Sequence, residues 1–247
     1  MEKDIDPDKK DSQTIARMFS RIVPTYDTVN HILSLGLDFY WRRRAVRCLD
    51  LVPEDSVLDV AVGTGDLLIR TFKTFPTITR AVGVDLSEEM LARCREKLAR
   101  RDLLERVELQ NADAQDLSFA DATFQAVTMG FGIRNTAHPE RVLQEIIRVL
   151  KPGGDTVILE FALPRRAWLR AGYLAYLRTI VPWVGGILSR QGRAYRYLNR
   201  SIESFVPSGQ FVTLLQTVGF VRIQSIPLCV GGVRVYHATK AGIPAQG

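Results

Sequence analysis

The fold is decided by the stretch Val57-Leu58-Asp59-Val60-Ala61-Val62-Gly63-Thr64-Gly65-Asp66. Its first part is apolar apart from one Asp, which predicts a short buried strand, and a glycine-rich turn follows before a helix can begin. Glycine lets the backbone approach a ligand where a side chain would collide. A second apolar run, 81–84, ends in Asp85, about 20 residues after Gly65, which leaves room for one helix and a return strand.

An acidic residue at that place can bind the two hydroxyls of a ribose, because a carboxylate accepts both O–H donors at once. These features predict a nucleoside cofactor on a doubly wound α/β sheet. A dinucleotide would require G-x-G-x-x-G facing a pyrophosphate, whereas here Ala61-x-Gly63-x-Gly65 is followed directly by Asp66. A carboxylate there repels a pyrophosphate but suits a cofactor with no phosphate and a cationic amino-acid tail. S-adenosyl-L-methionine is such a cofactor, and a plain tight turn is the alternative interpretation.

Strand and helix patterns alternate along most of the chain, which predicts an α/β fold with a mostly parallel, seven-stranded sheet. Three helices are expected before the sheet, with Pro24 ending the first, and a helical insertion before the last two strands. Residues 12–240 are interpreted as a single domain with the insertion at 161–202, between flexible tails at 1–11 and 241–247. Strands are expected at 57–60, 81–84, 106–110, 124–129, 155–161, 220–227 and 233–239, and helices at 12–22, 28–33, 39–49, 65–75, 87–101, 138–150 and 205–218.

The composition is that of an ordinary globular protein with a sizeable core: 247 residues, 46% of them hydrophobic and 24% charged. The three cysteines are far apart and the three histidines do not cluster, so we expect no disulfide, no metal site and a reducing cytoplasm. Residues 1–11 lack the apolar core of a signal peptide. No uncharged stretch approaches the ~18 residues that a membrane span requires.

The net charge of +6 is concentrated in the insertion. Residues 161–202 contain no Asp or Glu, and arginines there alternate with Trp and Tyr side chains. Such a surface suits nucleic acid or anionic lipid, and a solvated helix face packed on the core is the alternative. The residues concerned are Arg165, Arg166, Arg170, Arg178, Arg190, Arg193, Arg196 and Arg200, with Trp168, Tyr173, Tyr176, Trp183, Tyr195 and Tyr197.

Several motifs along the chain form one recognisable set. They are Tyr26-Asp27-x-x-Asn30, Leu35-Gly36-Leu37 before Trp41-Arg42, the glycine turn of 57–66, Phe131-Gly132-Ile133-Arg134-Asn135, Lys151-Pro152-Gly153-Gly154, Leu159-Glu160-Phe161, Tyr195-x-Tyr197-Leu198-x-x-Ser201-Ile202 and Gly219-Phe220. Over residues 50–160 the chain resembles class I S-adenosylmethionine-dependent methyltransferases, which have a Rossmann-like fold. Over nearly all of its length it resembles the C-methyltransferases of ubiquinone and menaquinone synthesis.

The resemblance implies S-adenosyl-L-methionine as the cofactor, held around the glycine turn and the strand ends that follow. A carboxylate such as Asp113 can accept the adenine amino group, and the small Ala114 leaves room for the ring. Gly130 stands where relatives of the ubiquinone branch often carry Ser. The candidate cofactor-binding residues are Asp59, Ala61, Gly63, Thr64, Gly65, Asp85, Leu86, Asp113, Ala114 and Gly130.

The implied reaction is C-methylation of a polyprenylated hydroquinone: demethylmenaquinol, the ubiquinol precursor, or both. A sulfonium methyl is already electrophilic, so the protein must position a carbon nucleophile and exclude water, and no metal is needed. A quinone ring is electron-poor, so the substrate must be the reduced quinol, activated by loss of a phenolic proton with a pKa of about 10. Arg134 is the candidate to favour the phenolate or to orient a water that takes the proton. Asn135 and Tyr26 are expected to position the phenolic oxygens, with Asp27 and His31 as weaker candidate proton acceptors.

A polyprenyl tail would give the insertion a purpose, because Trp and Tyr favour the lipid–water boundary and Arg binds anionic lipid. The chain is therefore interpreted as a cytoplasmic enzyme associated peripherally with an anionic membrane surface rather than with nucleic acid. A homodimer and a biosynthetic complex both stay open. Two other functions are compatible with the sequence: methylation of another small molecule or of RNA, and a non-catalytic scaffold that binds the cofactor or a prenyl lipid.

Overall fold

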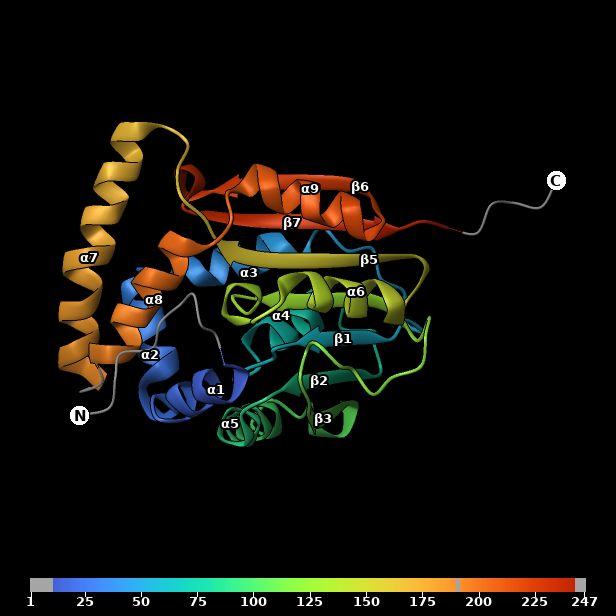
Figure 1. The fold of residues 1–247 in the computed structure, drawn as a ribbon. Helices are drawn as coiled ribbons and strands as arrows, with labels where there is room; N and C mark the ends of the chain where they lie inside the picture. Colours follow the sequence, from blue (N-terminus) through green and yellow to red (C-terminus); the bar gives the residue numbers. More distant parts are fainter. Residues whose placement is uncertain (1–10, 190–191, 243–247) are drawn as a thin grey trace.

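A twisted seven-stranded sheet runs through the middle of the computed structural model, which describes residues 11–189 and 192–242 (Figure 1). The strand order is β3-β2-β1-β4-β5-β7-β6. The first five strands of the chain pair in parallel, and β7 pairs antiparallel with both β5 and β6. The strands are β1 (Val57–Val60), β2 (Ala81–Asp85), β3 (Val107–Asn111), β4 (Phe124–Gly130), β5 (Leu150–Phe161), β6 (Phe220–Leu228) and β7 (Val233–Lys240).

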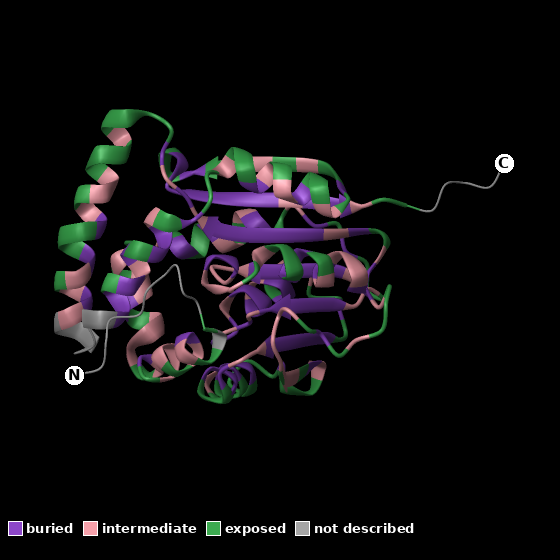
Figure 2. Cartoon of the chain, in the orientation of Figure 1, coloured by how far each residue is buried: buried purple, intermediate pink, exposed green. Residues whose placement is uncertain are grey.

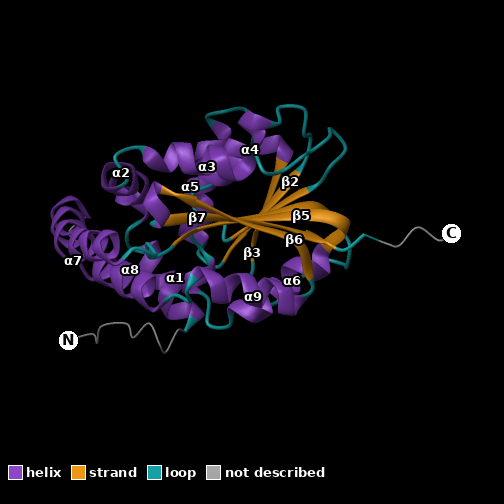
Figure 3. Cartoon of the chain, turned by 90° about the horizontal axis from the view of Figure 1, so that it is seen from above, coloured by secondary structure: helices purple, strands orange, loops and turns teal. Residues whose placement is uncertain are grey.

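Helices cover both faces of the sheet (Figure 3). One face packs against α3 (Leu37–Val46), α4 (Asp66–Thr74) and α5 (Glu88–Ala99), and the other against α6 (Pro139–Val149) and α9 (Ser208–Val218). β1 is buried along its whole length, with Val57 in the core on the first face and Leu58 and Val60 in the core on the second. A central parallel strand requires apolar side chains on both faces, because helices exclude water from both.

Four more helices gather beyond the carboxyl ends of the parallel strands (Figure 1). They are α1 (Ser12–Ser20), α2 (Val23–Leu33), α7 (Ala167–Ser189) and α8 (Gly192–Ser204). α7 packs against α8 and α2, and the Tyr176 hydroxyl of α7 donates a hydrogen bond to the Leu33 carbonyl of α2 at 2.6 Å. Figure 2 shows buried strands in the middle of the molecule and exposed residues along the outer side of α7. The N-terminal helices and the insertion therefore meet beyond the carboxyl ends of the strands, which is where open α/β sheets bind ligands.

The strands and helices lie close to where the sequence predicts them, and the largest differences are at element starts, among them α9, which begins at Ser208 rather than at 205. α2 begins at Val23 rather than at 28, and the prediction that Pro24 ends the first helix is wrong, because Pro24 lies in the first turn of α2. The first N–H groups of a helix have no partner within it, so proline is tolerated there. α3 begins at Leu37, after Gly36 with a φ of 74°. β5 begins at Leu150 rather than at 155, because Leu150 already pairs with β4.

The expected tails lie mostly outside the described residues, which exclude 1–10 and 243–247. Asp11 caps α1, its carboxylate accepting a hydrogen bond from the Thr14 amide at 3.0 Å. Within 11–189 and 192–242, the structure contains no helix whose length and apolar character would let it span a bilayer.

Candidate functional site

Two cavities adjoin at the carboxyl ends of the strands. The glycine-loop cavity, about 750 Å³, is lined by residues that follow β1, β2, β3 and β4 and by side chains of α1 and α2. The aromatic cavity, about 930 Å³, lies among α2, α3, α7 and α8. Both volumes include space open to solvent. The strand ends thus form most of the wall of the first cavity, and the N-terminal helices and the insertion form most of the wall of the second.

The turn after β1 has a backbone that few residues adopt. Ala61, Gly63 and Gly65 all have left-handed φ values, of 54°, 54° and 86°. A Cβ on Gly65 would lie 2.5 Å from the Cys94 sulfur of α5, so this position requires glycine for space as well as for conformation. The turn therefore brings its backbone into contact with α5 and opens the space that a ligand would occupy.

Asp85, at the end of β2, braces this turn. Its Oδ2 accepts a hydrogen bond from the Gly63 amide at 2.8 Å, and its Oδ1 accepts one from the Ser87 amide at 2.9 Å. Burial raises the pKa of Asp85, and these backbone N–H groups oppose the rise. Each carboxylate oxygen has a second lone pair, so Asp85 retains the capacity to accept two ribose hydroxyls.

The glycine-loop cavity is also lined by Asp113 and Asn135, polar groups suited to an adenine and an amino group. The Asp113 carboxylate accepts hydrogen bonds from Gln115, with its Oδ1 2.9 Å from the Gln115 amide, and Ala114 lies beside it in the wall. The Asn135 amide nitrogen donates to the Phe131 carbonyl at 3.2 Å. Its Oδ1 is buried and accepts no hydrogen bond from the described residues. A buried acceptor without a donor fits a ligand that brings an N–H or O–H group.

Most of the predicted cofactor-binding residues line the glycine-loop cavity, and three do not. Asp59, Thr64 and Gly65 do not line it. Asp59 is buried within the sheet, where its Oδ1 accepts a hydrogen bond from the Thr128 hydroxyl at 2.8 Å and its Oδ2 has no partner among the described residues. The predicted residues that do line it are Ala61, Gly63, Asp85, Leu86, Asp113, Ala114 and Gly130, with Asn135 and Tyr26 of the predicted catalytic group.

Arg134 lies in the wall of the aromatic cavity and is 3% exposed. Its Nη1 lies 2.7 Å from the Glu160 carboxylate and donates to the Phe131 carbonyl at 2.6 Å, while its Nε donates to the Ser201 hydroxyl at 3.3 Å. Glu160 is completely buried. The guanidinium is thus fixed by partners from β5 and α8 before any substrate is present.

Three aromatic residues line both cavities: Phe19, Tyr26 and Phe131. Burial raises the pKa of Tyr26, and the charges of Arg134 and Arg42 oppose the rise. Phe131 has a left-handed φ of 57°, which is unusual for a bulky residue, and its ring packs against Phe161 at an interplanar angle of 35° with centroids 4.6 Å apart. These rings form the junction through which a group could pass from one cavity to the other.

The comparisons with known proteins agree with this geometry. The model of the ubiE/COQ5 methyltransferase family matches residues 7–240. The chain belongs to this family. It is 38% identical over 234 residues to a demethylmenaquinone methyltransferase of Bacteroides fragilis, covering 94% of this chain and 95% of that protein. It is 42% identical over 208 residues to the ubiquinone/menaquinone biosynthesis C-methyltransferase UbiE of Geobacter sulfurreducens, covering 84% and 81%. The protein is therefore an S-adenosylmethionine-dependent methyltransferase.

Solved structures confirm the predicted fold class. A methyltransferase of Thermotoga maritima, described as a possible histamine N-methyltransferase, has a TM-score of 0.61 at 21% identity, covering 92% of this chain and 99% of that one. The [4+2]-cyclase SpnF has a TM-score of 0.64 at 16% identity, covering 95% and 97%. At these identities the likeness shows the fold alone, the class I methyltransferase fold. The glycine-loop cavity, with Asp85 and with an Asn135 Oδ1 that has no partner in the described part of the chain, fits the S-adenosylmethionine that the family uses.

Sequence reasoning missed a buried lysine next to the glycine turn. Lys97 of α5 is 7% exposed and contacts Asp27, Thr64 and Asp66. Position 97 falls on the apolar face of the helix, with Met90 and Cys94, and a lysine on an apolar face is the signal that could have revealed it.

We expect Asp85→Ala to weaken S-adenosylmethionine binding by about 1.5–3 kcal/mol, because the ribose would lose hydrogen bonds to a charged acceptor. Calorimetric titration measures this directly. Asp116→Ala is the control, since Asp116 is exposed in the turn after β3 and lines neither cavity. Equal affinity of the two variants would mean that the ribose is held elsewhere.

The substitution Asp59→Asn tests whether the buried carboxyl in β1 is protonated in the folded protein. Burial raises the pKa of Asp59 to about 7, and a hydrogen bond from Thr128 opposes the rise. In the unfolded chain the carboxyl has a pKa of about 3.9. Between these two pKa values, the folded protein holds a proton that the unfolded chain has lost. This group therefore lowers stability as the pH rises from about 4 to 7.

Asparagine does not titrate, so the stability of the Asp59→Asn variant relative to wild type should increase between pH 5 and pH 8 by on the order of 2 kcal/mol. Urea unfolding at the two pH values gives the difference. Asp50→Asn, at an exposed position, should show no such change. A relative stability independent of pH would show that Asp59 is ionised in the folded protein.

Proposed function

We propose that the protein transfers the methyl group of S-adenosylmethionine to a ring carbon of a reduced polyprenyl quinol, demethylmenaquinol or the corresponding ubiquinol precursor. The observation that carries this proposal is the junction of the two cavities at Tyr26 and Phe131. A flat aromatic substrate suits a cavity walled by aromatic rings, because offset and edge-to-face ring contacts are favourable. The names of the relatives from Bacteroides fragilis and Geobacter sulfurreducens support the same substrate class.

The proposed reaction needs positioning and charge rather than a metal. When bound, S-adenosylmethionine would supply an electrophilic methyl: its S–CH₃ bond would break as the ring C–CH₃ bond forms, S-adenosylhomocysteine would leave, and the methylated ring carbon would then lose its proton to water. Loss of the phenolic proton makes the ring nucleophilic, and a guanidinium favours the resulting phenolate. Arg134 faces the aromatic cavity and is held by Glu160 at 2.7 Å, so its charge is fixed in place.

The positions of Asn135 and Tyr26 also support methyl transfer to a quinol. Both line the glycine-loop cavity, and Tyr26 also lines the aromatic cavity, so either could contact a phenolic oxygen close to the methyl group. Asp27 and His31 line neither cavity. Asp27 is bound by Lys97, and His31 lies 2.7 Å from the Asp38 carboxylate, so we do not propose them as proton acceptors.

The test of Arg134 must keep the buried charges balanced. Replacing Arg134 alone would leave the Glu160 carboxylate buried without a cation beside it, which is strongly destabilising. We therefore expect the double variant Arg134→Met/Glu160→Gln, which removes both buried charges of the pair, to lose about 100-fold in kcat, with S-adenosylmethionine affinity close to wild type.

The assay follows transfer of labelled methyl to a water-soluble, short-chain quinol under reducing conditions. Normal turnover by the folded double variant would exclude a role for Arg134 in the reaction. Methylation of RNA or of an unrelated phenol by the wild-type protein, with no reaction on quinols, would overturn the proposed substrate class. Binding of cofactor without any methylation would favour a scaffold.

We also propose that the outer face of α7 contacts an anionic membrane surface, from which a polyprenyl substrate would be taken. Trp168 and Trp183 are each 68% exposed. Arg165, Arg166 and Arg170 are exposed and form no ion pair within the described residues. Trp at a lipid boundary and Arg opposite anionic headgroups each favour interfacial contact.

The insertion does not present all of its predicted residues to a membrane. Arg178 pairs with Glu203 at 2.6 Å, so its charge is compensated within the protein. Tyr173, Tyr176, Tyr195 and Tyr197 line the aromatic cavity and thus point inward. Arg190 lies outside the described residues. The proposed membrane surface is therefore the outer face of α7, which carries Trp168 and Trp183, together with the segment before this helix.

We expect Arg165→Glu/Arg166→Glu/Arg170→Glu to bind anionic liposomes at least tenfold more weakly, because each Arg near such a surface contributes about 1 kcal/mol. Wild-type binding should also weaken as salt rises. Sedimentation with liposomes measures both, and turnover of a water-soluble quinol should stay near wild type.

The control is Lys73→Glu/Arg80→Glu/Arg95→Glu, which changes the net charge equally at exposed positions outside the insertion. Equal loss of binding in both triple variants would show a general charge effect. No difference between anionic and neutral liposomes for the wild-type protein would leave α7 as a solvated cap.

A further inference from the structure

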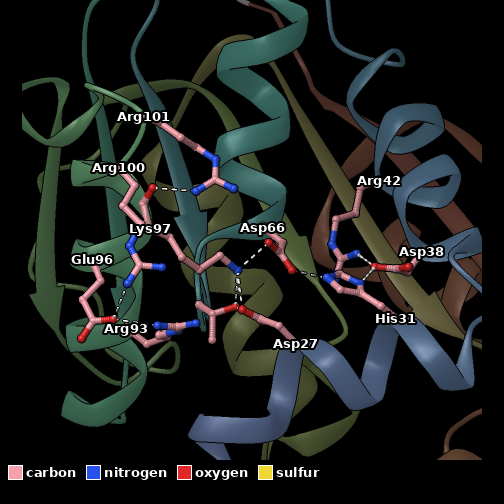
Figure 4. Close-up of polar contacts among 11 residues, drawn as sticks. Asp27, His31, Asp38, Arg42, Asp66, Arg93, Glu96, Lys97, Arg100 and Arg101 are labelled. Carbon is pink, nitrogen blue, oxygen red and sulfur yellow. Dashed lines mark hydrogen bonds and ion pairs between the residues drawn. The ribbon is translucent and has the colours of Figure 1, made fainter.

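A buried ion network joins α2, α5 and the glycine turn (Figure 4). Lys97 of α5 is at its centre, and its side chain is 8% exposed. The ammonium lies 2.8 Å from Asp27 and 2.6 Å from Asp66, and donates to the Thr64 hydroxyl at 3.0 Å. Lys97 lines neither cavity, so it does not belong to the ligand-contacting residues described above.

The three partners of Lys97 come from elements that must be held together at the site. Asp27 belongs to α2, Thr64 to the glycine turn and Asp66 to the start of α4. The Thr64 hydroxyl also donates to Asp27, at 2.6 Å, so the turn and α2 are linked directly as well as through the ammonium. Tyr26, which precedes Asp27 on α2, is one of the junction residues. The position of Tyr26 relative to the glycine turn therefore depends on this link.

The network continues from Asp66 into α3. Asp66 lies 3.5 Å from the Arg42 guanidinium, Arg42 also contacts Asp38, and Asp38 is bound by His31 at 2.7 Å. Burial opposes ionisation of Asp66, yet its pKa is lowered, because Arg42 and Lys97 favour the carboxylate. Without the Lys97 ammonium, the carboxylates of Asp27 and Asp66 would face each other close to one remaining cation.

Burial of an ion network is poor evidence for stability, since well-packed apolar residues often stabilise a core as well or better. What such a network does supply is a fixed geometry between the elements that it joins. Here those elements are the turn next to the cofactor cavity and the helix that carries Tyr26.

We propose that Lys97 is a positioning residue for methyl transfer. It holds α2 against the glycine turn, so that Tyr26 stands at the junction of the two cavities with the geometry that the reaction needs. The effect on turnover rests on the proposed function, whereas the effect on α2 does not. A misplacement of reacting groups by about 1 Å can cost about 100-fold in rate, so a loosened α2 should slow catalysis more than it weakens cofactor binding.

The experiment compares Lys97→Met with wild type and with Arg93→Met. Arg93 is a cation on the same helix whose ion pair, with Glu96, lies on the surface. Three experiments are carried out on the full chain: amide hydrogen exchange in 23–33 without ligands, titration for the dissociation constant of S-adenosylmethionine, and steady-state kinetics with a water-soluble reduced quinol.

We expect Lys97→Met to increase exchange in 23–33 at least tenfold and to lower kcat at least tenfold, with cofactor affinity changed less than fivefold. Arg93→Met should match wild type in all three, and Lys97→Arg should recover part of kcat. Should Lys97→Met fail to fold, Asp27→Asn loosens the same link while retaining a hydrogen-bond acceptor, and should change exchange and kcat in the same direction.

Unchanged exchange in 23–33, or wild-type kcat, would overturn the proposal. A loss of cofactor affinity as large as the loss in kcat would overturn it too, because Lys97 would then act on cofactor binding. If the wild-type protein and Arg93→Met both fail to methylate the quinol, the proposed function is wrong, and the exchange measurement still decides whether Lys97 holds α2.

Discussion

The hydrogen bond from the Gly63 amide to the Asp85 carboxylate is the interaction on which the site depends. It joins the turn after β1 to the end of β2, and these two segments form one side of the glycine-loop cavity. The turn can reach Asp85 only because its backbone adopts left-handed conformations, and Gly65 has no Cβ to meet Cys94. The carboxylate is thus held by backbone N–H groups and has lone pairs left for a ligand.

The second cavity depends on segments that are far apart in the chain. Its walls come from the N-terminal helices and from the insertion, which the Tyr176–Leu33 hydrogen bond ties together at 2.6 Å. Under the proposed function this arrangement has a chemical reason: a methyl group must pass between two ligands without contact with water, and the rings of Phe19, Tyr26 and Phe131 border both spaces.

Local patterns predicted the strands, the glycine turn and the place of Asp85, because strand ends and turn residues are determined by neighbours in the chain. Contacts across the sheet were not predictable in the same way. Arg134 was identified from its motif, but its ion pair with Glu160 arises because β4 and β5 lie side by side. The composition of 161–202 suggested one charged, aromatic surface, whereas the helices separate these residues: the tyrosines line a cavity and Trp168 and Trp183 are exposed.

The buried charges show why a motif alone gives an incomplete account of such a site. Arg134 and Lys97 are both buried cations, and each is matched by carboxylates from other elements. Arg134 lines a cavity and can act on a bound substrate, whereas Lys97 lines none and can act only through the elements that it joins. Under the proposed function the charge of Arg134 acts on the bound substrate, whereas the charge of Lys97 is satisfied within the protein. Because Asp27 and Asp66 satisfy Lys97 fully, the network adds no net attraction for an anionic ligand, and its contribution to function is geometric.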